Sequence, residues 1–315
     1  MRKLFLLCLL LSLVIGVNAQ DISIKQVITN NKTTKHINIP GTRLFMIPQG
    51  NFSTSKGFIG LQKGESSMIN IYDLVGGNFY TNAATFDKEG FEKQGIKVFE
   101  FKEIKVNGYP AKYISMQGEP GVKAIGLVFG DTTFSTMIMA IYPADDETTK
   151  QEIINSLNSI LYDKSQHIDA FATANFSLND KDTKFKFFQY SANLYIYSIN
   201  GKDNSADADA PIVIVTQMPL DNSTTVKVIT DMMISKAQQY GMTGQEIKNQ
   251  SAEKLNGYDC NQAEVYGQMK GKSSLIYVCS IGKGDKAVVI QGIAQKDIVT
   301  NLAEFKKLAT TIKMK

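Results

Sequence analysis

The chain has 315 residues and a formal net charge of +4, from 34 lysine and arginine residues against 30 aspartate and glutamate residues. This length suggests about two domains, and the 43% hydrophobic content lets each half bury a core, which argues against disorder over most of the chain. Arg43 is the only arginine after Arg2. Because arginine dominates bidentate recognition of phosphates and bases, this scarcity argues against a nucleic-acid partner.

The first 19 residues have the pattern of a secretory signal peptide. Arg2 and Lys3 form a basic start, residues 4–17 are almost continuously apolar, and Val17-Asn18-Ala19 fits a small-residue cleavage site. The apolar run, which includes Cys8, is too short for a committed membrane span. We therefore expect an exported protein, periplasmic or extracellular, with no transmembrane span after cleavage of residues 1–19.

A polar leader over residues 20–41 precedes the first predicted domain, residues 42–162. Apolar alternation in this domain predicts strands at residues 42–47, 57–62, 68–74, 111–117, 122–129 and 134–142. A weak helical pattern covers residues 79–94. A closing helix is indicated by a stripe of apolar residues, Ile154, Leu157 and Leu161.

A short polar linker, residues 163–168, leads to the second predicted domain, residues 169–315. Its predicted strands cover residues 183–190, 193–199, 211–217, 260–267, 274–281 and 287–293. A clear amphipathic helix begins with a cap at Asp221 or Ser223 and ends at Gly241. The apolar stripe of the closing helix consists of Phe305, Leu308 and Ile312.

The tripeptide Asn-Gly-Tyr occurs once in each half, as Asn107-Gly108-Tyr109 and as Asn256-Gly257-Tyr258, 149 residues apart. We predict a further strand in each half that leads into this tripeptide. Glycine permits the backbone of a tight turn, so we interpret both copies as structural turns between two strands of one sheet. The strands that follow are joined by so few residues that they must be antiparallel. The repeated order of elements predicts a tandem duplication into two α+β domains, each a mainly antiparallel sheet flanked by helices.

This order of three strands, a helix, four strands and a helix, with Asn-Gly-Tyr between the later strands, resembles the PsbP-like family. That family includes the extrinsic protein of photosystem II and a Ran-binding nuclear import factor of the same fold. The resemblance covers both copies and implies an α/β/α sandwich that works mainly by binding partners. It carries no functional residue over, because no ligand-binding motif of either relative is recognisable in this chain.

Two cysteines remain after signal cleavage, Cys260 and Cys279, and both lie in the second copy. A hairpin folded about the midpoint of residues 269 and 270 places them directly opposite each other, at a separation that suits a disulfide. Because export permits disulfides, we predict a structural one, worth about 3 kcal/mol of stability in the chain-entropy model. The alternative is a pair of buried thiols, and the spacing disfavours a redox-active pair.

Other candidate chemistry has weaker support. The only histidines, His36 and His167, fall in the leader and the linker, so a histidine-based triad is not expected. The loop at residues 201–210 supplies three weak calcium candidates, Asp203, Asp207 and Asp209. The calcium-loop pattern fails there because alanine and isoleucine occupy its required glycine and glutamate positions, so a solvated loop is the main expectation. No cofactor is expected.

These observations favour a non-enzymatic binding or assembly module of the cell envelope, whose partner is another envelope or extracellular protein. A small-ligand carrier that uses a groove between the domains is the alternative, and a large apolar cavity near residues 163–169 would distinguish it. The third hypothesis is a hydrolase without a recognisable motif. We rank it last because no carboxylates are paired in the sequence.

Overall fold

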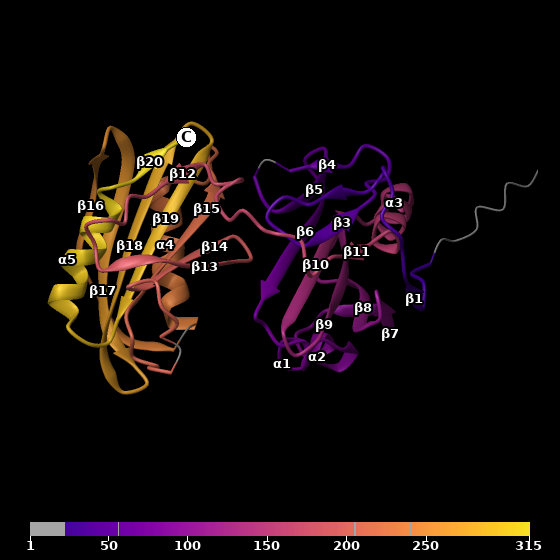
Figure 1. Ribbon diagram of the computed structural model, residues 1–315, viewed down its shortest axis with the longest axis horizontal. Helices are drawn as coiled ribbons and strands as arrows, with labels where there is room; N and C mark the ends of the chain where they lie inside the picture. Colours follow the sequence, from indigo (N-terminus) through magenta and orange to yellow (C-terminus); the bar gives the residue numbers. More distant parts are fainter. Residues whose placement is uncertain (1–22, 56, 205, 240) are drawn as a thin grey trace, which may run out of the picture.

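The computed structural model describes residues 23–55, 57–204, 206–239 and 241–315. The predicted signal peptide, residues 1–19, lies outside these ranges. The described residues form two domains that lie side by side along the longest axis of the molecule (Figure 1). Within the described residues, no helix combines the length and the apolar character needed to cross a membrane.

The first domain contains an eight-stranded sheet in the order β1-β7-β8-β9-β10-β6-β5-β4. The strands are Val27–Ile28 (β1), Ser53–Thr54 (β4), Gly60–Lys63 (β5), Ser67–Val75 (β6), Lys97–Val106 (β7), Tyr109–Gln117 (β8), Val122–Gly130 (β9) and Phe134–Pro143 (β10). Neighbours are antiparallel except β1, which pairs in parallel with β7. A smaller sheet of order β11-β3-β2 contains Ile37–Asn38 (β2), Leu44–Met46 (β3) and Leu161–Tyr162 (β11).

Helices cover both faces of the first sheet. The helix α3, Glu147–Asn158, buries Ile153 and Leu157 in the main core. The opposite face is covered by α1, Phe79–Asn82, and α2, Lys88–Glu92, which contribute to a separate apolar cluster.

The predicted single helix over residues 79–94 is wrong, because the segment contains two helix starts. The side chain of Asn78 accepts a hydrogen bond from Tyr80 N at 2.9 Å, and Asp87 accepts one from Gly90 N at 2.7 Å. Such caps favour short helices over one continuous helix. The closing helix α3 ends before Leu161, which lies in β11 and not in the predicted helical stripe.

The described part of the leader belongs to the first domain. Ile24 and Ile28 are buried in the main core. The C-terminal end of α3 binds the leader, since Asn158 Oδ1 accepts from Lys25 N at 2.9 Å and Asn158 Nδ2 donates to Ser23 O at 3.1 Å. The leader therefore completes the core of this domain and is not a separate segment before it.

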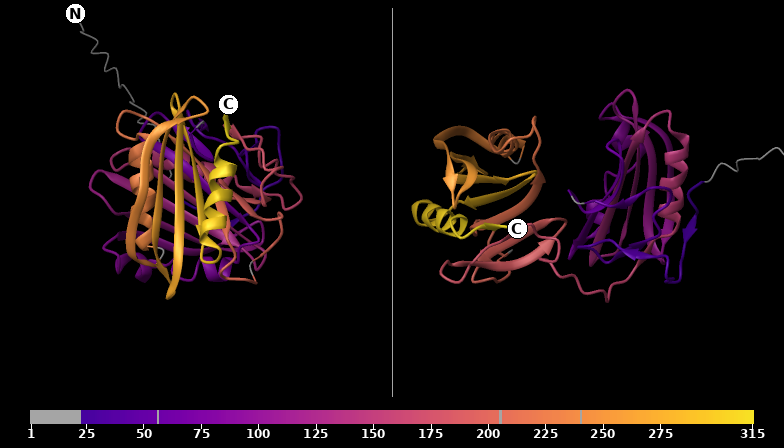
Figure 2. Two further views of the ribbon diagram at one scale, coloured as in Figure 1. Left: turned by 90° about the vertical axis from the view of Figure 1, so that its left-hand side faces the viewer. Right: turned by 90° about the horizontal axis from the view of Figure 1, so that it is seen from above.

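The second domain contains a seven-stranded sheet in the order β13-β14-β15-β19-β18-β17-β16. The strands are Phe185–Ser191 (β13), Leu194–Ile199 (β14), Ile212–Pro219 (β15), Met242–Leu255 (β16), Tyr258–Met269 (β17), Lys272–Lys283 (β18) and Lys286–Ala294 (β19). A two-stranded sheet pairs Phe176–Ser177 (β12) with Lys313–Met314 (β20). The helices α4, Val226–Gln239, and α5, Ile298–Ala309, lie on opposite faces of the main sheet (Figure 2).

The two main sheets have the same strand order. From β4 to β7, the first sheet matches the second from β13 to β16, position by position. Each closing helix is also followed by a short strand, β11 or β20, that pairs outside the main sheet. The prediction of an α+β fold with mainly antiparallel sheets flanked by helices is confirmed.

Each Asn-Gly pair forms the two-residue turn of a hairpin, β7–β8 or β16–β17. The φ angles are 50° and 86° at Asn107 and Gly108, and 53° and 84° at Asn256 and Gly257. Positive φ at both central residues is typical of a type I′ turn, whose twist matches that of the flanking strands. In each copy the tyrosine begins the following strand.

Each turn asparagine also binds the chain that follows the closing helix. Asn107 Oδ1 accepts from Tyr162 N at 3.0 Å. Asn256 Nδ2 donates to Thr310 O at 2.8 Å and to Ile312 O at 3.0 Å. The repeated motif therefore ties the hairpin β7–β8 or β16–β17 to the segment after the closing helix of its domain.

Candidate functional site

The cysteine pair, Cys260 and Cys279, lies on the adjacent strands β17 and β18. The predicted register is wrong by two residues, because Gln262 is opposite Cys279 and Cys260 is opposite Ile281. The turn is centred on Lys270 and Gly271, both with positive φ, one residue later than expected. The cysteines are thus diagonal neighbours on one face of the sheet.

The two cysteines are buried free thiols in this structure, with their sulfur atoms 3.5 Å apart. The hydrogen bond shared with Cys260, together with burial, raises the pKa of the Cys279 thiol. The same hydrogen bond lowers the pKa of Cys260. The disulfide remains a prediction, and the sulfur atoms are close enough to form one after small side-chain movements.

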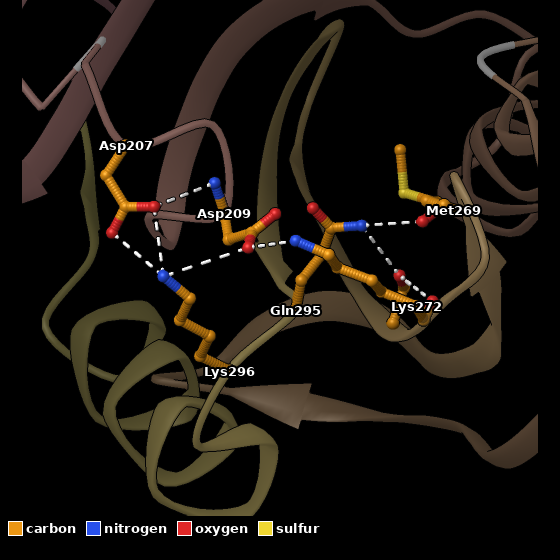
Figure 3. Close-up of polar contacts among 7 residues, drawn as sticks. Asp207, Asp209, Met269, Lys272, Gln295 and Lys296 are labelled. Carbon is orange, nitrogen blue, oxygen red and sulfur yellow. Dashed lines mark hydrogen bonds and ion pairs between the residues drawn. The ribbon is translucent and has the colours of Figure 1, made fainter.

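The acidic loop before β15 is neutralised by lysines. Asp207 accepts from Lys296 Nζ at 3.0 and 3.1 Å, and Asp209 binds Lys272 directly and Lys296 at 3.8 Å (Figure 3). The hydrogen bond from Lys296 lowers the pKa of Asp207 and raises that of Lys296. The weak calcium candidates are therefore not assembled as a ligand set, and no cluster of three metal-binding side chains occurs among the described residues.

Next to this loop is a cavity of about 310 Å³. Its walls combine apolar and polar side chains, and they include Asp209, Ile212, Met269, Ile293 and Gln295. Gln295 Nε2 donates to Met269 O at 3.0 Å and to Ser274 Oγ at 3.2 Å, so its amide joins the cavity wall to the β17–β18 hairpin (Figure 3).

A wider cavity of about 480 Å³ lies where the chain enters α4, and it is lined by three aspartates, Asp221, Asp259 and Asp285. Asp221 accepts from Ser223 Oγ, Ser223 N and Thr224 N at 2.7 Å each, and these hydrogen bonds lower its pKa. Asp259 is paired with Lys254 at 2.6 Å. Two of these acids thus have structural partners, and neither cavity lies at the junction of residues 163–169 that the carrier hypothesis requires.

The domain junction contains direct contacts between the two sheets. Gln189 Nε2 on β13 donates to Val75 O at the end of β6, at 3.2 Å. Tyr190 reaches Gly41, where a Cβ would lie 2.7 Å from the tyrosine Oη. At this junction, side chains of the second domain therefore contact the backbone of the first domain.

Buried beside the junction is the carboxylate of Asp73, which accepts hydrogen bonds from Arg43 N, Thr136 Oγ1 and Tyr162 Oη, each at 2.9 Å. Burial, followed by the charge of Asp73, raises the pKa of Tyr162. This cluster joins β6, β10 and the small sheet, and all its hydrogen bonds are within the first domain, so we interpret it as structural.

The histidines also have no catalytic arrangement. His36 Nδ1 accepts from Thr33 N at 3.1 Å, and its Nε2 lies 3.0 Å from Ser159 O. His167 is exposed in the linker.

A buried carboxylate on β17 shapes the neighbouring edge strand. Glu264 accepts from Lys306 Nζ on α5 at 2.6 Å, from Asn249 Nδ2 at 3.0 Å and from Tyr266 Oη at 3.1 Å. Burial opposes the charge, but the hydrogen bonds from Lys306 and Asn249 outweigh it and lower the pKa of Glu264. Asn249 has a φ of 52° and lies within a bulge of β16 between Lys248 and Ser251.

The strand expected before the second Asn-Gly turn is β16, and the feature that the sequence did not reveal is its open outer edge. The strand is 14 residues long, and it is the last strand of its sheet in the described part of the chain. Bulges interrupt its pairing between Thr243 and Ser251, whereas Ser251 to Leu255 pair with β17 in unbroken register. Most of its side chains are exposed and polar, so its sequence lacks the apolar alternation that marks a half-buried strand.

Comparison with known proteins found no matching family model and no matching curated protein. Similar solved structures include LpqN, involved in cell envelope biogenesis of Mycobacterium tuberculosis, with a TM-score of 0.35, 13% identity, and coverage of 44% of this chain and 83% of LpqN. The cyanobacterial PsbP of Synechocystis sp. PCC 6803 has a TM-score of 0.31 and 13% identity, over 48% of this chain and 99% of its own.

The type VI secretion immunity protein TplEi of Pseudomonas aeruginosa matches over both domains, with 89% of this chain and 97% of its own covered, at a TM-score of 0.31 and 9% identity. Similarities of this strength concern the arrangement of strands and helices, and the functions of these proteins are not transferred by them.

Proposed function

We propose that this chain is an exported, non-enzymatic binding module of the cell envelope, and that its second domain binds another protein. The observation that supports this proposal is the exposed outer edge of β16. Open edges with unpaired backbone groups are protein-binding features, and soluble proteins usually cover or interrupt them.

The functional groups of the second domain support a binding role over a catalytic one. The carboxylates of Asp207, Asp209 and Glu264 are held by lysines, and that of Asp221 by the N-terminal turn of α4. A general acid or base requires a titratable group that is free to exchange a proton with a substrate. These acids instead fix loops and strands in place.

The shared strand order and the spacing of the two Asn-Gly-Tyr motifs support an origin of the two domains by tandem duplication. The copies differ at one edge of the sheet. In the first domain β1 pairs with β7, whereas the equivalent strand β16 of the second domain has no such neighbour in the described residues. We infer that the first copy stabilises the molecule and that the second copy binds.

The proposal is tested by purifying the tagged full chain from its native envelope after chemical crosslinking, and by identifying co-purified proteins. A candidate must then bind the purified mature chain in calorimetry with a saturable, stoichiometric signal. Stoichiometric binding of a protein supports the proposal. It is contradicted if the chain co-purifies with no such protein, or if the purified chain turns over a substrate in hydrolase screens.

A further inference from the structure

The first domain shows how the edge that is open in the second domain is covered. Lys105 N donates to Gln26 O at 3.0 Å, and Asn107 N donates to Ile28 O at 2.8 Å. These bonds place β1 parallel to β7, immediately before the Asn-Gly turn. The leader thus supplies an extended strand, and its residue Ile28 is fully buried.

The second domain presents the same backbone groups. With the 149-residue spacing, the positions equivalent to Lys105 and Asn107 are Lys254 and Asn256. Leu255 and Tyr258 flank the two-residue turn and pair with each other, and Lys254 pairs with Asp259. Antiparallel pairs alternate between hydrogen-bonded and non-hydrogen-bonded, so the N–H of Lys254 points away from β17, as that of Lys105 does.

The open segment is limited to the turn end of β16. The bulge at Asn249 is fixed by the buried Glu264, and it disrupts pairing in the preceding part of the strand. Bulges of this kind protect edges against indiscriminate pairing. From Ser251 to Leu255 the register is regular, and this is the segment that corresponds to the β1-covered part of β7.

The side chains beside this edge differ between the copies, and the difference defines the partner. Ile104 and Val106 of the first domain are buried together with the leader isoleucines. The equivalent residues are Glu253, which is exposed, and Leu255, which is half-buried. Glu253 is bound by the amide of Gln262, and no lysine among the described residues pairs with it. The surface therefore suits a segment with a cationic side chain near Glu253 and an apolar one near Leu255.

We propose that an extended segment of a partner protein adds to the second sheet as a strand parallel to β16, with its carbonyls accepting from Lys254 N and Asn256 N and a lysine or arginine reaching Glu253. This inference rests on the proposed function and specifies its site. Strand addition of this type obtains affinity from backbone hydrogen bonds and specificity from alternate side chains.

The test uses a phage-displayed library of random decapeptides, selected on the immobilised mature chain. Selected peptides are then synthesised, and their Kd values are measured against the wild type and the variants. We expect selected peptides to be enriched in lysine or arginine and to slow amide hydrogen exchange at Lys254 and Asn256.

Two pairs of variants separate the edge from the rest of the surface. Lys254→Pro removes the N–H that the partner strand is proposed to bind, and proline is tolerated where the N–H points away from the neighbouring strand, whereas Lys254→Ala also loses the lysine side chain but keeps the donor. We expect at least tenfold weaker binding for Lys254→Pro than for Lys254→Ala. Glu253→Lys should weaken binding tenfold or more and Glu253→Gln less, which tests the charge if the proline variant does not fold.

The inference is overturned if no peptides are selected, if they bind Lys254→Pro and Glu253→Lys as tightly as wild type, or if protection appears elsewhere on the chain. It is also overturned if the mature chain forms a dimer through β16, or if the free leader peptide of residues 23–30 occupies the edge as tightly as the selected peptides. Any of these results leaves the proposed function intact as long as a stoichiometric protein partner is found by co-purification.

Discussion

Replacing Asn256 separates two contributions of this residue to stability, the hydrogen bonds of its side chain and its left-handed backbone conformation. Asn256→Gly retains the left-handed backbone but removes the hydrogen bonds to Thr310 O and Ile312 O, at 2.8 and 3.0 Å. At about 0.5–1.5 kcal/mol net for each bond, and with an exposed side chain that favours the lower values, the loss should be about 1–2 kcal/mol. Asn256→Ala should cost about 1 kcal/mol more, because alanine is strained at a φ of 53°.

The matched change in the first domain should be milder. Asn107 makes one side-chain bond to the corresponding segment, to Tyr162 N, so Asn107→Gly should cost about 1 kcal/mol. The chain has no tryptophan but has 13 tyrosines, so urea unfolding can be followed by tyrosine fluorescence together with far-UV circular dichroism. For a urea dependence of about 1–3 kcal/mol per molar, the Asn256→Gly midpoint should fall by about 0.3–2 M.

The turn variants also distinguish the domains. If the domains unfold in separate transitions, the Asn256 variants should shift one transition and Asn107→Gly the other. An Asn256→Gly variant as stable as wild type would refute the anchoring role. Equal stability of the glycine and alanine variants would refute the importance of the left-handed turn.

Three further outcomes follow from the second domain. Thiol labelling of the unfolded, unreduced protein from the envelope should find no free thiol in the cysteine pair, and reduction should lower stability by about 3 kcal/mol; two free thiols would exclude the disulfide. Glu264→Gln should cost about 1–3 kcal/mol at pH 7 by weakening the charged hydrogen bond from Lys306. Folding lowers the pKa of Glu264, so the stability that its carboxylate contributes is present above the unfolded pKa of about 4.3 and is lost as the pH falls through the folded pKa. The urea midpoints of wild type and Glu264→Gln should therefore converge in acid. Gly292→Ala should destabilise by about 1–3 kcal/mol in thermal melts, because the new Cβ would lie 2.4 Å from the buried ring of Phe305; an unchanged Tm would show that α5 can move away freely.

Local patterns in the sequence determined the element types and the fold class. Turn residues and apolar alternation marked most strands of both sheets, and the Asn-Gly pairs located the hairpins β7–β8 and β16–β17. These features are predictable because a type I′ turn and a half-buried strand each require particular residues at neighbouring positions. Capping by Asn78 and Asp87 was a local signal too, and it explains why one predicted helix is two.

Contacts between distant segments were decided by the tertiary structure. The lysines that neutralise the acidic loop lie more than 60 residues further along the chain, as in the pair of Asp209 and Lys272, so spacing within the loop could not predict them. The cysteine register depended on a shift of one residue in the turn centre, which moves the cross-strand partner by two positions.

The sequence by itself determined two similar α+β halves, because the periodicity of side chains along a segment is a local property. Only the tertiary structure decided that the leader covers the sheet edge of the first half while the corresponding edge of the second half is open. That difference depends on which strands lie beside each other, and the residues of β16 do not by themselves indicate whether another strand pairs with its outer edge. The candidate binding surface arises from this packing, since backbone N–H groups become available only where no neighbouring strand pairs with them.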